Sequence, residues 1–585
     1  MRPVSARFAA PGGGRFGRSF VFFGLIKVLR ADALAEVAPA FAALEAAVAA
    51  GYHAAGFVAY EAAAAFNPDL PIGAPPKTPL LWFAIFAERR EVATLPRNSP
   101  LRLPVLPRTT IPDAAGYEAA ITAIHAAIAD GETYQVNYTL RQRFVAPEDS
   151  TALYSTLCQT QQAPFCAHIE TGDLSIVSAS PELFFARQGE KIVMRPMKGT
   201  ARRAAESAAD LAVRSALAAS PKERAENLMI VDLVRSDLSR LAITGSVQVE
   251  SLFDVESYPT VHQLTSTVSA QLAPATTTFQ IFSALFPCGS VTGAPKRRTM
   301  EIIRDLEAAP RGLYCGAIGF VSPQESVFSV AIRTVVIDHE SGEAELGIGS
   351  GVTSDSSCAA EYAESFAKSR FLDIDPTPFS LIESLRRQET GGYFLLERHL
   401  QRLAASAEYF AFSWNRNAVL TELQQCDAEL HGAHKVRLLL AQDGTVTLCA
   451  EPLPAARRRF PLTMLLSPQR VQADDPFLFH KTTRRDLYNA ERGRFPGVDE
   501  VLFCNDAGEV TEGSLHNLVL RQGGRLLTPA LACGLLPGTL RGELLERGIL
   551  HEAVLTDRDL RAAEGLWLIN SVRGWRRAIL VDSEE

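Results

Sequence analysis

The chain has 585 residues, of which 47% are hydrophobic and 21% charged, with a formal net charge of −8. This composition is typical of a globular protein with more than one core, and it excludes a disordered chain and a strongly basic nucleic-acid-binding protein. The nine cysteines are scattered without a Cys-x-x-Cys pair, which argues against a disulfide framework and a structural zinc site. The apolar run Phe20–Ile26 is short and flanked by charge, so we expect a cytoplasmic protein with no secretory signal and no membrane span.

The first part of the chain alternates short strand-like runs with helices. Ala31–Ala50 carries apolar residues at helical spacing, Asn98–Pro112 is a proline-rich loop, and Tyr117–Asp130 is an amphipathic helix. Gly131–Leu140 follows as an alternating strand, which we interpret as scaffold rather than as part of a site.

One lysine, Lys198, follows a predicted hairpin and precedes a Gly-Thr turn. Leu183–Phe185 and Ile192–Met194 have the length and composition of two short paired strands. A lysine at the end of such a strand can have its ammonium withdrawn from bulk water, which lowers its pKa and makes the amine a nucleophile or a proton carrier. Lys198 is therefore a candidate catalytic residue.

Two pairs of glutamates lie three residues apart on predicted helices. A Ser-Pro dipeptide at 220–221 is a favourable helix start, and Glu223 and Glu226 share one face of that helix. Glu361 and Glu364 repeat the spacing on a later helix. A single pair of this kind is usually a solvated acidic face, but two pairs from separate helices form a suitable hard-oxygen site for Mg²⁺.

Several segments between and after these pairs are suited to binding an anion. Phe286–Lys296 combines glycines, hydroxyl donors and a proline at a helix start, which together form an oxyanion cradle. A tyrosine and an arginine on predicted strands, a close-approach glycine loop and a lysine follow. The candidate substrate-binding residues are Gly289, Ser290, Thr292, Gly293, Tyr314, Arg333, Gly349, Gly351 and Lys368.

Pro-Met-Lys-Gly-Thr at 196–200 resembles the Pro-Ile-Lys-Gly-Thr signature of the aminodeoxychorismate synthase component I branch of the chorismate-utilising family. The resemblance covers roughly residues 50–372 and implies an α+β fold, a β-sandwich flanked by helices, for a domain over residues 1–372. In the anthranilate synthase component I branch an alanine replaces the lysine, so Lys198 argues against that alternative.

Further motifs carry the same resemblance. Glu-Asn-Leu-Met-Ile-Val-Asp-Leu at 226–233 and Glu-Tyr-Ala-Glu at 361–364 are similar to the two metal motifs of the family, and Val-His-Gln-Leu at 261–264 to a motif whose histidine points at the reacting ring. The implied roles are direct Mg²⁺ ligands for Glu226 and Glu364, Mg²⁺ ligands through water for Glu223 and Glu361, and a catalytic role for His262.

The resemblance implies that ammonia replaces the 4-hydroxyl of chorismate to give 4-amino-4-deoxychorismate. Lys198 would attack C2 as the hydroxyl leaves with acid assistance, and ammonia would then add at C4 and expel the lysine. The anion-binding segments and Mg²⁺ match the two carboxylates of chorismate. The sequence contains no Gly-x-Cys-x-Gly nucleophile elbow, so we expect ammonia to come from a separate glutamine amidotransferase subunit.

The pattern changes after a linker at residues 373–378, which is rich in proline and acidic residues. Phe379–Leu385 is strand-like and Tyr393–Phe410 is helical. Four motifs, at 399–403, 479–483, 510–517 and 535–541, then occur in the order found in fold-type IV pyridoxal-phosphate enzymes. This resemblance implies a second domain over residues 379–585 with a two-subdomain α/β fold.

The second resemblance also implies roles for single residues. Lys481 would carry pyridoxal phosphate, Arg402 would bind its phosphate, and Glu512 would lie against its pyridine nitrogen and keep it protonated. Asn517, Gly538 and Thr539 would add phosphate contacts. A homodimer through this domain is an arrangement that the resemblance allows.

Several reactions are compatible with the second domain. It lacks the first strand and the Asp-Arg-Gly-Phe-x-x-Gly-Asp-Gly segment with which complete members of this family begin. A branched-chain or D-amino-acid aminotransferase and a non-catalytic docking module therefore stay open as alternatives. Covalent linkage to the first domain favours 4-amino-4-deoxychorismate lyase, which would consume the product of the first domain and release pyruvate and 4-aminobenzoate, a folate precursor.

Overall fold

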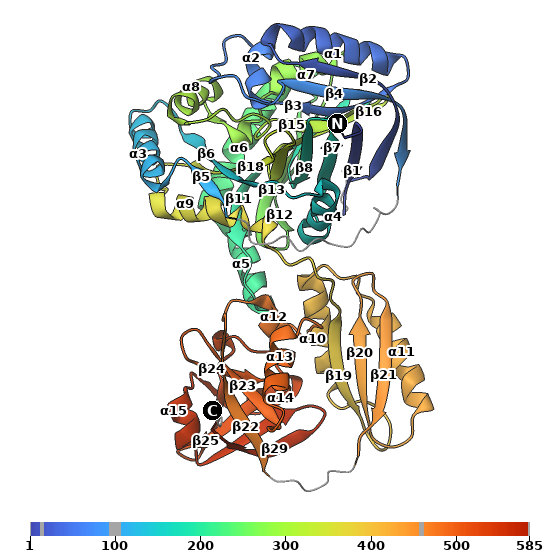
Figure 1. Cartoon of the computed structure of the whole chain (residues 1–585), viewed down its shortest axis with the longest axis vertical. Helices are drawn as coiled ribbons and strands as arrows, with labels where there is room; N and C mark the ends of the chain where they lie inside the picture. The colour runs from blue at the N-terminus through green and yellow to red at the C-terminus, as the bar shows by residue number, and fades with distance from the viewer. Residues whose placement is uncertain (1, 12–16, 93–106, 455–460, 583–585) are drawn as a thin grey trace. The chain divides into compact units, whose positions relative to one another are not determined.

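A computed structural model describes residues 2–11, 17–92, 107–454 and 461–582 in two compact units (Figure 1). The first unit contains the described residues of Met1–Arg202 and Arg214–Thr377, and the second contains those of Arg203–Val213 and Pro378–Glu585. Within the described ranges, no helix has the length and apolar character needed to cross a membrane. Most of the predicted loop Asn98–Pro112 lies outside them.

The first unit is built on one network of eighteen antiparallel strands, arranged as two runs that join where β1 pairs with β2. The first run, in order of pairing, is β2 (Phe20–Ala31), β4 (Leu81–Glu91), β3 (His53–Val58), β15 (Ala317–Val321), β16 (Glu325–Val330), β9 (Leu183–Gln188), β10 (Lys191–Arg195) and β13 (Val261–Gln271), with β11 (Met197–Arg202) and β12 (Gln248–Ser257) also paired to β13. The second run is β1 (Ser5–Ala9), β7 (Phe165–Glu170), β8 (Leu174–Ser180), β17 (Thr334–Asp338), β18 (Glu343–Val352) and β6 (Gln135–Val145), with β5 (Thr109–Ile111) and β14 (Gly293–Ala294) paired to β6.

The two runs pack face to face and helices cover their outer faces. One core cluster contains Phe57 and Trp82 of the first run together with Phe8 and Ile169 of the second. The first run is covered by α1 (Leu34–Ala49), α2 (Ala63–Phe66), α6 (Pro221–Ser239) and α7 (Thr278–Leu285). The second is covered by α3 (Ala114–Ala129), α4 (Ser150–Gln161), α8 (Lys296–Leu306) and α9 (Cys358–Ala367). Short 3₁₀ turns are η1 (Tyr60–Ala62), η2 (Gly289–Val291) and η3 (Arg370–Leu372). The predicted helix-flanked β-sandwich is confirmed.

Local predictions near Lys198 hold in part. Strands β9 and β10 form the predicted hairpin, and the Ser220 hydroxyl accepts the Glu223 N–H at the start of α6. Lys198, however, does not follow the hairpin as a strand end before a turn. It lies inside β11, where Gly199 (φ +96°) and a register shift against β13 form a bulge instead of a turn.

Three other placements differ from the sequence interpretation. Tyr314 lies in the turn before β15, and Arg333, with φ +48°, immediately precedes β17, so neither is within a strand. The glycines at 347, 349 and 351 belong to strand β18 rather than to a loop. In each case, glycine or turn residues lie next to a run of β-branched residues. The sequence pattern alone does not define where a strand begins or ends in such a stretch.

The second unit has two sheets, as the two-subdomain prediction required. The smaller sheet consists of β19 (Leu381–Arg387), β20 (His434–Leu440) and β21 (Val446–Pro452), and it packs with α10 (Leu396–Tyr409) and α11 (Arg416–Glu429) (Figure 1). The larger, mixed sheet has the order β24 (Val510–Gly513), β23 (Glu500–Asn505), β22 (Leu462–Val471), β29 (Gly574–Leu580), β28 (Gly565–Asn570), β25 (Asn517–Gln522), β26 (Arg525–Pro529) and β27 (His551–Ala553). The remaining helices are α5 (Ser207–Ala219), α12 (Pro476–Phe479), α13 (Asp486–Arg494), α14 (Thr539–Glu546) and α15 (Asp557–Ala562), with a 3₁₀ turn η4 (Leu531–Cys533).

Candidate functional sites

Lys198 lies among charged groups from several elements of the first unit. Burial lowers the pKa of Lys198; the nearby Lys368 ammonium adds to this effect, and the carboxylates of Glu226 and Glu182 oppose it. Gly351 of β18 leaves room for the amine, because a Cβ at that position would lie 2.7 Å from Lys198 Nζ. The lysine predicted from sequence therefore has the lowered pKa that a nucleophile needs.

Glu182, which the sequence reasoning missed, is a buried carboxyl with the properties of a general acid in this site. Its Oε1 accepts a 2.6 Å hydrogen bond from Ser290 Oγ and a longer one, 3.4 Å, from Met197 N. Burial raises the pKa of Glu182 to about 7, although the Ser290 hydrogen bond and the Lys198 charge oppose the rise. The available signal was a glutamate directly before an apolar strand, where a charge is otherwise unfavourable.

Gln135, at the start of β6, also lies close to Lys198. A Cβ at Gly351 would lie 2.3 Å from Gln135 Nε2 and 2.7 Å from Lys198 Nζ, so both groups border the same glycine. Both amide atoms of Gln135 are buried and without a hydrogen-bond partner among the described residues. A buried amide without partners is costly unless a water or a ligand satisfies it, so Gln135 is a candidate for contact with a ligand beside Lys198.

The four predicted metal-binding glutamates lie on α6 and α9. Burial raises the pKa values of Glu223 and Glu226, and neighbouring carboxylates, Glu364 among them, add to both shifts. Glu364 differs, because the Lys368 ammonium, 2.7 Å away, lowers its pKa. Glu361 is buried and accepts a 2.7 Å hydrogen bond from Ser356 Oγ. Across the described ranges, no three His, Cys, Asp or Glu side chains are arranged closely enough to hold a metal ion as they stand.

The segment around η2 uses its predicted hydroxyl donors within the protein. Ser290 donates to Glu182, and Thr292 Oγ1 donates to the Cys288 carbonyl at 3.1 Å. Gly293 is required for close approach to β6, because a Cβ there would lie 2.0 Å from the Gln135 carbonyl oxygen. Gly289 is less restrictive, since its Cβ would meet only the Leu233 side chain. The segment is thus held firmly beside Glu182 and Gln135.

Arg333 has a guanidinium nitrogen that an anionic ligand could use. Its Nη1 is buried and has no hydrogen-bond partner among the described residues, and burial lowers the pKa of its guanidinium. The guanidinium carbon lies 5.6 Å from the ring centroid of Tyr258. An enclosed guanidinium nitrogen without an acceptor is suited to a carboxylate.

The remaining predicted residues of the first unit have structural contacts. Tyr314 packs against Arg141, whose guanidinium carbon lies 5.2 Å from the ring centroid. Lys368 Nζ donates to the Gly349 carbonyl at 2.9 Å, which links α9 to β18. His262 is buried on β13 opposite Ala201, and its Nδ1 lies 2.9 Å from Ser257 Oγ.

In the second unit, Lys481 lies among charged groups of both signs. Burial lowers the pKa of Lys481 to about 8, with Arg402 and Arg485 adding to the shift and Glu383 and Glu512 opposing it. Arg402 of α10 is fixed by two hydrogen bonds to the buried Glu383, at 2.9 and 2.6 Å, and by a third to the Pro537 carbonyl. Arg402 and Lys481 are therefore brought together as predicted.

Glu512, Asn517, Gly538 and Thr539 lie close to one another. Glu512 accepts hydrogen bonds from Tyr488 OH and Asn517 Nδ2, both at 3.2 Å, and burial raises its pKa to about 7. A Cβ at Gly538 would lie 1.9 Å from Asn517 Oδ1, so a larger residue there would displace the Asn517 side chain. Thr539, at the start of α14, lies 3.3 Å from His399 Nε2.

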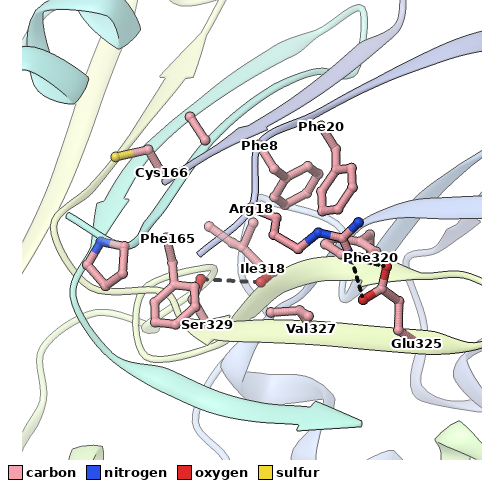
Figure 2. Close-up of a pocket in the computed structure, with 12 residues that line it drawn as sticks. Phe8, Arg18, Phe20, Phe165, Cys166, Ile318, Phe320, Glu325, Val327 and Ser329 are labelled. Atoms are coloured by element: carbon pink, nitrogen blue, oxygen red, sulfur yellow. Dashed lines mark hydrogen bonds and ion pairs between the residues drawn. The ribbon is translucent and has the colours of Figure 1, made fainter. Parts of the chain in front are cut away.

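A cavity of about 300 Å³ opens beside Arg402, Gly538 and Thr539. Its volume is at the lower limit for pockets that enclose a small organic ligand. A second cavity, in the first unit, measures about 40 Å³ and is lined by aromatic rings and the Arg18–Glu325 ion pair (Figure 2). That space is sufficient only for water, and it contains none of the predicted site residues.

Comparison with known proteins assigns a family model to each half of the chain. The model described as chorismate binding enzyme matches residues 13–373, and that described as amino-transferase class IV matches residues 380–580. The first match contains the motifs around Lys198, and the second contains those around Lys481.

Relatives of known name match the first half. An aminodeoxychorismate synthase from Streptomyces griseus is 44% identical over 259 residues, which are 44% of this chain and 35% of that protein. Aminodeoxychorismate synthase component 1 from Klebsiella aerogenes is 41% identical over 301 residues, 48% of this chain and 66% of that protein. The chain thus spans between about a third and two thirds of the length of these relatives. The structure of anthranilate synthase component I from Streptococcus pneumoniae shares the fold, with a TM-score of 0.54 and 23% identity over 64% of this chain and 94% of that one.

Proposed function

Because the chain belongs to the chorismate binding enzyme family and continues into a class IV amino-transferase domain, we propose that it makes 4-aminobenzoate from chorismate in two steps. In the first, ammonia replaces the 4-hydroxyl of chorismate and water is released. In the second, the resulting 4-amino-4-deoxychorismate loses pyruvate. The observation that carries the proposal is the Lys198 amine with its lowered pKa, close to the buried Glu182 carboxyl and to the unpaired Gln135 amide.

In the first step Lys198 and Glu182 act as nucleophile and acid. The Lys198 amine attacks C2, both ring double bonds shift (C1=C2 to C1=C6 and C5=C6 to C4=C5), and the C4–O bond breaks while Glu182 gives its proton to the leaving hydroxyl. The pKa of Glu182, about 7, leaves a substantial protonated fraction at neutral pH. Ammonia then bonds to C4 as the C2–N bond to Lys198 breaks, and the Gln135 amide is available to orient it.

Anionic parts of chorismate have two sets of partners in this proposal. Arg333 would bind one carboxylate through its unpaired Nη1. The glutamates of α6 and α9 fit Mg²⁺ in donor chemistry, and the mutual repulsion that adds to the raised pKa values of Glu223 and Glu226 is what a cation relieves. Glu226 and Glu364 would bind it directly, with Glu223 and Glu361 acting through water; the bound ion would neutralise a substrate carboxylate.

Residues of the second unit fit pyridoxal phosphate. A cavity of about 300 Å³ adjoins Arg402, Gly538 and Thr539, Arg402 is held by Glu383, and the Lys481 amine has a lowered pKa. Lys481 would carry the cofactor, Arg402 and Thr539 would hold its phosphate, and Glu512 would face its ring nitrogen; the cofactor supplies an electron sink. In the second step Lys481 would move the proton that leads to loss of pyruvate.

A product assay tests the proposal. Full-length protein would receive chorismate, Mg²⁺, ammonium at high pH and pyridoxal phosphate, with chromatographic detection of 4-aminobenzoate and pyruvate. We expect both products without added lyase, and a Lys198→Ala variant that forms no aminodeoxychorismate. Full activity of Lys198→Ala would contradict the covalent route. Accumulation of aminodeoxychorismate that only an added lyase converts would contradict the second step.

Two alternatives for the second unit give different results in the same assay. An aminotransferase would require an amino donor and would consume it in proportion to product. A docking module would leave the second reaction dependent on a separate lyase, with or without pyridoxal phosphate. We also propose that ammonia comes from a separate glutamine amidotransferase subunit. When that subunit is added, glutamine should support the first reaction in place of ammonium.

A further inference from the structure

One short segment of the second unit lies, in sequence, between two parts of the chain that form the first unit. Residues Arg203–Val213 belong to the second unit, whereas Arg202 before them and Arg214 after them belong to the first. The segment begins directly after β11, the strand that carries Lys198. Nothing in the proposed function so far uses it.

The segment is anchored on α10. Arg203 Nη1 donates a 2.8 Å hydrogen bond to the Tyr409 carbonyl, and the guanidinium carbon lies 3.8 Å from the centroid of the Tyr409 ring. Ala205 packs against the cluster that contains Phe479 and Tyr488. Hydrogen-bonding, cation–π and apolar contacts thus fix the segment on one surface.

An ion pair and hydrogen bonds within the segment fix its conformation. Arg203 Nη2 lies 2.6 Å from Asp210 Oδ2, and the two side chains are only 8% and 7% exposed. The other oxygen of Asp210 accepts the Ala204 N–H at 3.0 Å. The Glu206 carboxylate accepts two backbone N–H groups at the start of α5, at 2.9 and 2.7 Å. A buried ion pair of this kind favours one geometry, and loss of one partner leaves an uncompensated charge.

Tyr409, which Arg203 contacts, also packs against His480, the residue before Lys481. The His480 ring lies with its centroid 4.4 Å from that of Tyr409, and its Nδ1 is 2.9 Å from Ser406 Oγ. Burial lowers the pKa of His480 to about 4, and the Arg203 charge adds to the shift, so this ring is neutral at neutral pH. On the other side, the Lys481 carbonyl accepts the Ile382 N–H at 2.8 Å.

The segment also forms part of the cavity. Glu206 and Ser207 line the 300 Å³ space together with Arg402, His480 and Thr539. One boundary of the space in which Arg402 and Thr539 lie is therefore supplied by residues that precede α6 in the chain.

We propose that the segment Arg203–Val213 forms part of the second site. The Arg203–Asp210 ion pair positions His480 and, through it, Lys481. Glu206 and Ser207 close one wall of the cavity. Arg203 and Asp210 are positioning residues, since neither is assigned a contact with substrate or cofactor. The inference rests on the proposed function of the second unit as a pyridoxal-phosphate enzyme.

The test uses three substitutions in the full-length protein: Arg203→Met, Asp210→Asn and, as a matched control, Arg214→Met at an exposed position of α5. Pyridoxal phosphate would be titrated into cofactor-free protein to obtain its Kd, and the cofactor absorbance would be followed against pH. The first reaction would be assayed with an added lyase, the second from aminodeoxychorismate alone.

We expect Arg203→Met and Asp210→Asn to weaken cofactor binding and slow the second reaction about tenfold each, because misplacement of a reacting group is costly. The pH at which the cofactor absorbance changes should also shift. Breaking the buried pair should lower the melting temperature of the cofactor-free protein, but at an assay temperature well below it the first reaction should be retained and the shift in the absorbance titration should persist. Arg203→Lys should recover part of the loss, and Arg214→Met should match the wild type.

Two outcomes would overturn the inference. One is wild-type cofactor affinity and second-step rate in both Arg203→Met and Asp210→Asn. The other is a loss that follows a lowered melting temperature of the cofactor-free protein without a shift in the absorbance titration, which would make the segment purely structural. Failure of the wild-type protein to bind pyridoxal phosphate would instead contradict the proposed function.

Discussion

Ser290 Oγ donates a 2.6 Å hydrogen bond to Oε1 of Glu182, and this bond links the Gly-Ser-Val-Thr segment to the carboxyl beside Lys198. The hydroxyl is therefore a partner of the proposed acid rather than a free donor for a substrate anion. Because the bond opposes the rise in the pKa of Glu182 that burial causes, Ser290 helps to set the pH at which that carboxyl loses its proton.

The first prediction follows from this bond. If Glu182 acts as an acid, kcat/KM for chorismate, measured at a constant concentration of free ammonia, should fall as pH rises through about 7, the pKa of that carboxyl. Ser290→Ala removes a contact that lowers this pKa, so the fall should move to higher pH. Glu182→Gln should reduce the rate about a thousandfold. Ser236→Ala, at an exposed position on α6, is the control; an unchanged or lowered pH midpoint in Ser290→Ala would remove Glu182 from this role.

A second prediction concerns Gly351. An alanine Cβ there would lie 2.7 Å from Lys198 Nζ and 2.3 Å from Gln135 Nε2, both at the ends of flexible side chains that can move. We therefore expect Gly351→Ala to keep its melting temperature and to lose about a hundredfold in the first reaction, because the reacting groups are displaced. Gly73→Ala, where a Cβ would meet nothing within 4 Å, is the matched control. Equal activity of the two variants would contradict the proposed site.

A third prediction separates catalysis from docking in the second unit. Lys481→Ala should abolish cofactor attachment and 4-aminobenzoate release while the first reaction, measured with added lyase, stays within about twofold of wild type, since the lysine touches only the second site. Lys435→Ala, in a surface ion pair with Glu451, should change neither reaction. Release of 4-aminobenzoate by Lys481→Ala at the wild-type rate would remove Lys481 from the reaction, and no release by either protein without added lyase would favour a non-catalytic second unit.

The fourth prediction concerns stability and pH. Although burial alone would raise the pKa of Glu383, Arg402 and His399 hold it at about 2, below its ordinary value of 4.5. A lowered pKa stabilises the folded form above the ordinary value, and this contribution is lost as pH falls from about 4.5 toward 2. Glu383→Gln should destabilise the second unit by about 3 kcal/mol at pH 7, because it leaves the Arg402 guanidinium without its carboxylate partner.

Thermal melting between pH 7 and pH 3 would measure this effect. The difference in melting temperature between wild type and Glu383→Gln should narrow below about pH 4.5, where the Glu383 carboxylate takes up a proton in the unfolded chain while it stays ionised in the folded protein. Glu422→Gln, on the exposed side of α11, serves as control. A difference in melting temperature that stays constant from pH 7 to pH 3 would show that the Glu383 charge does not stabilise the fold.

Sequence motifs predicted the helices and strands that carry most of the site. Lys198, Glu226 and Lys368 do interact electrostatically, and Arg402 and Lys481 do likewise in the second unit. Periodicity located the helices and apolar strands on which, or next to which, these residues lie, whereas their roles came from the resemblance of the motifs to two known families.

What sequence reasoning missed depends on contacts distant in the chain. Glu182 and Ser290 are 108 residues apart, so no local pattern identifies their hydrogen bond. Gln135 lies in a segment that alternates as any strand does, and its role appears only where β18 brings Gly351 next to it. Segment 203–213 has the composition of an ordinary alanine-rich helix, and its membership of the second unit is a tertiary property.

Because Arg203–Val213 belongs to the second unit, separating the two activities requires more than one cut in the chain. A single cut at Pro378 divides the polypeptide but not the two folded bodies, since Arg203–Val213 stays behind on the other fragment. A gene encoding only the C-terminal piece would leave the Tyr409 and Phe479 surface without its partner. A fusion of this kind is therefore no longer a tandem of interchangeable modules, and recombination at the linker would not restore two independent proteins.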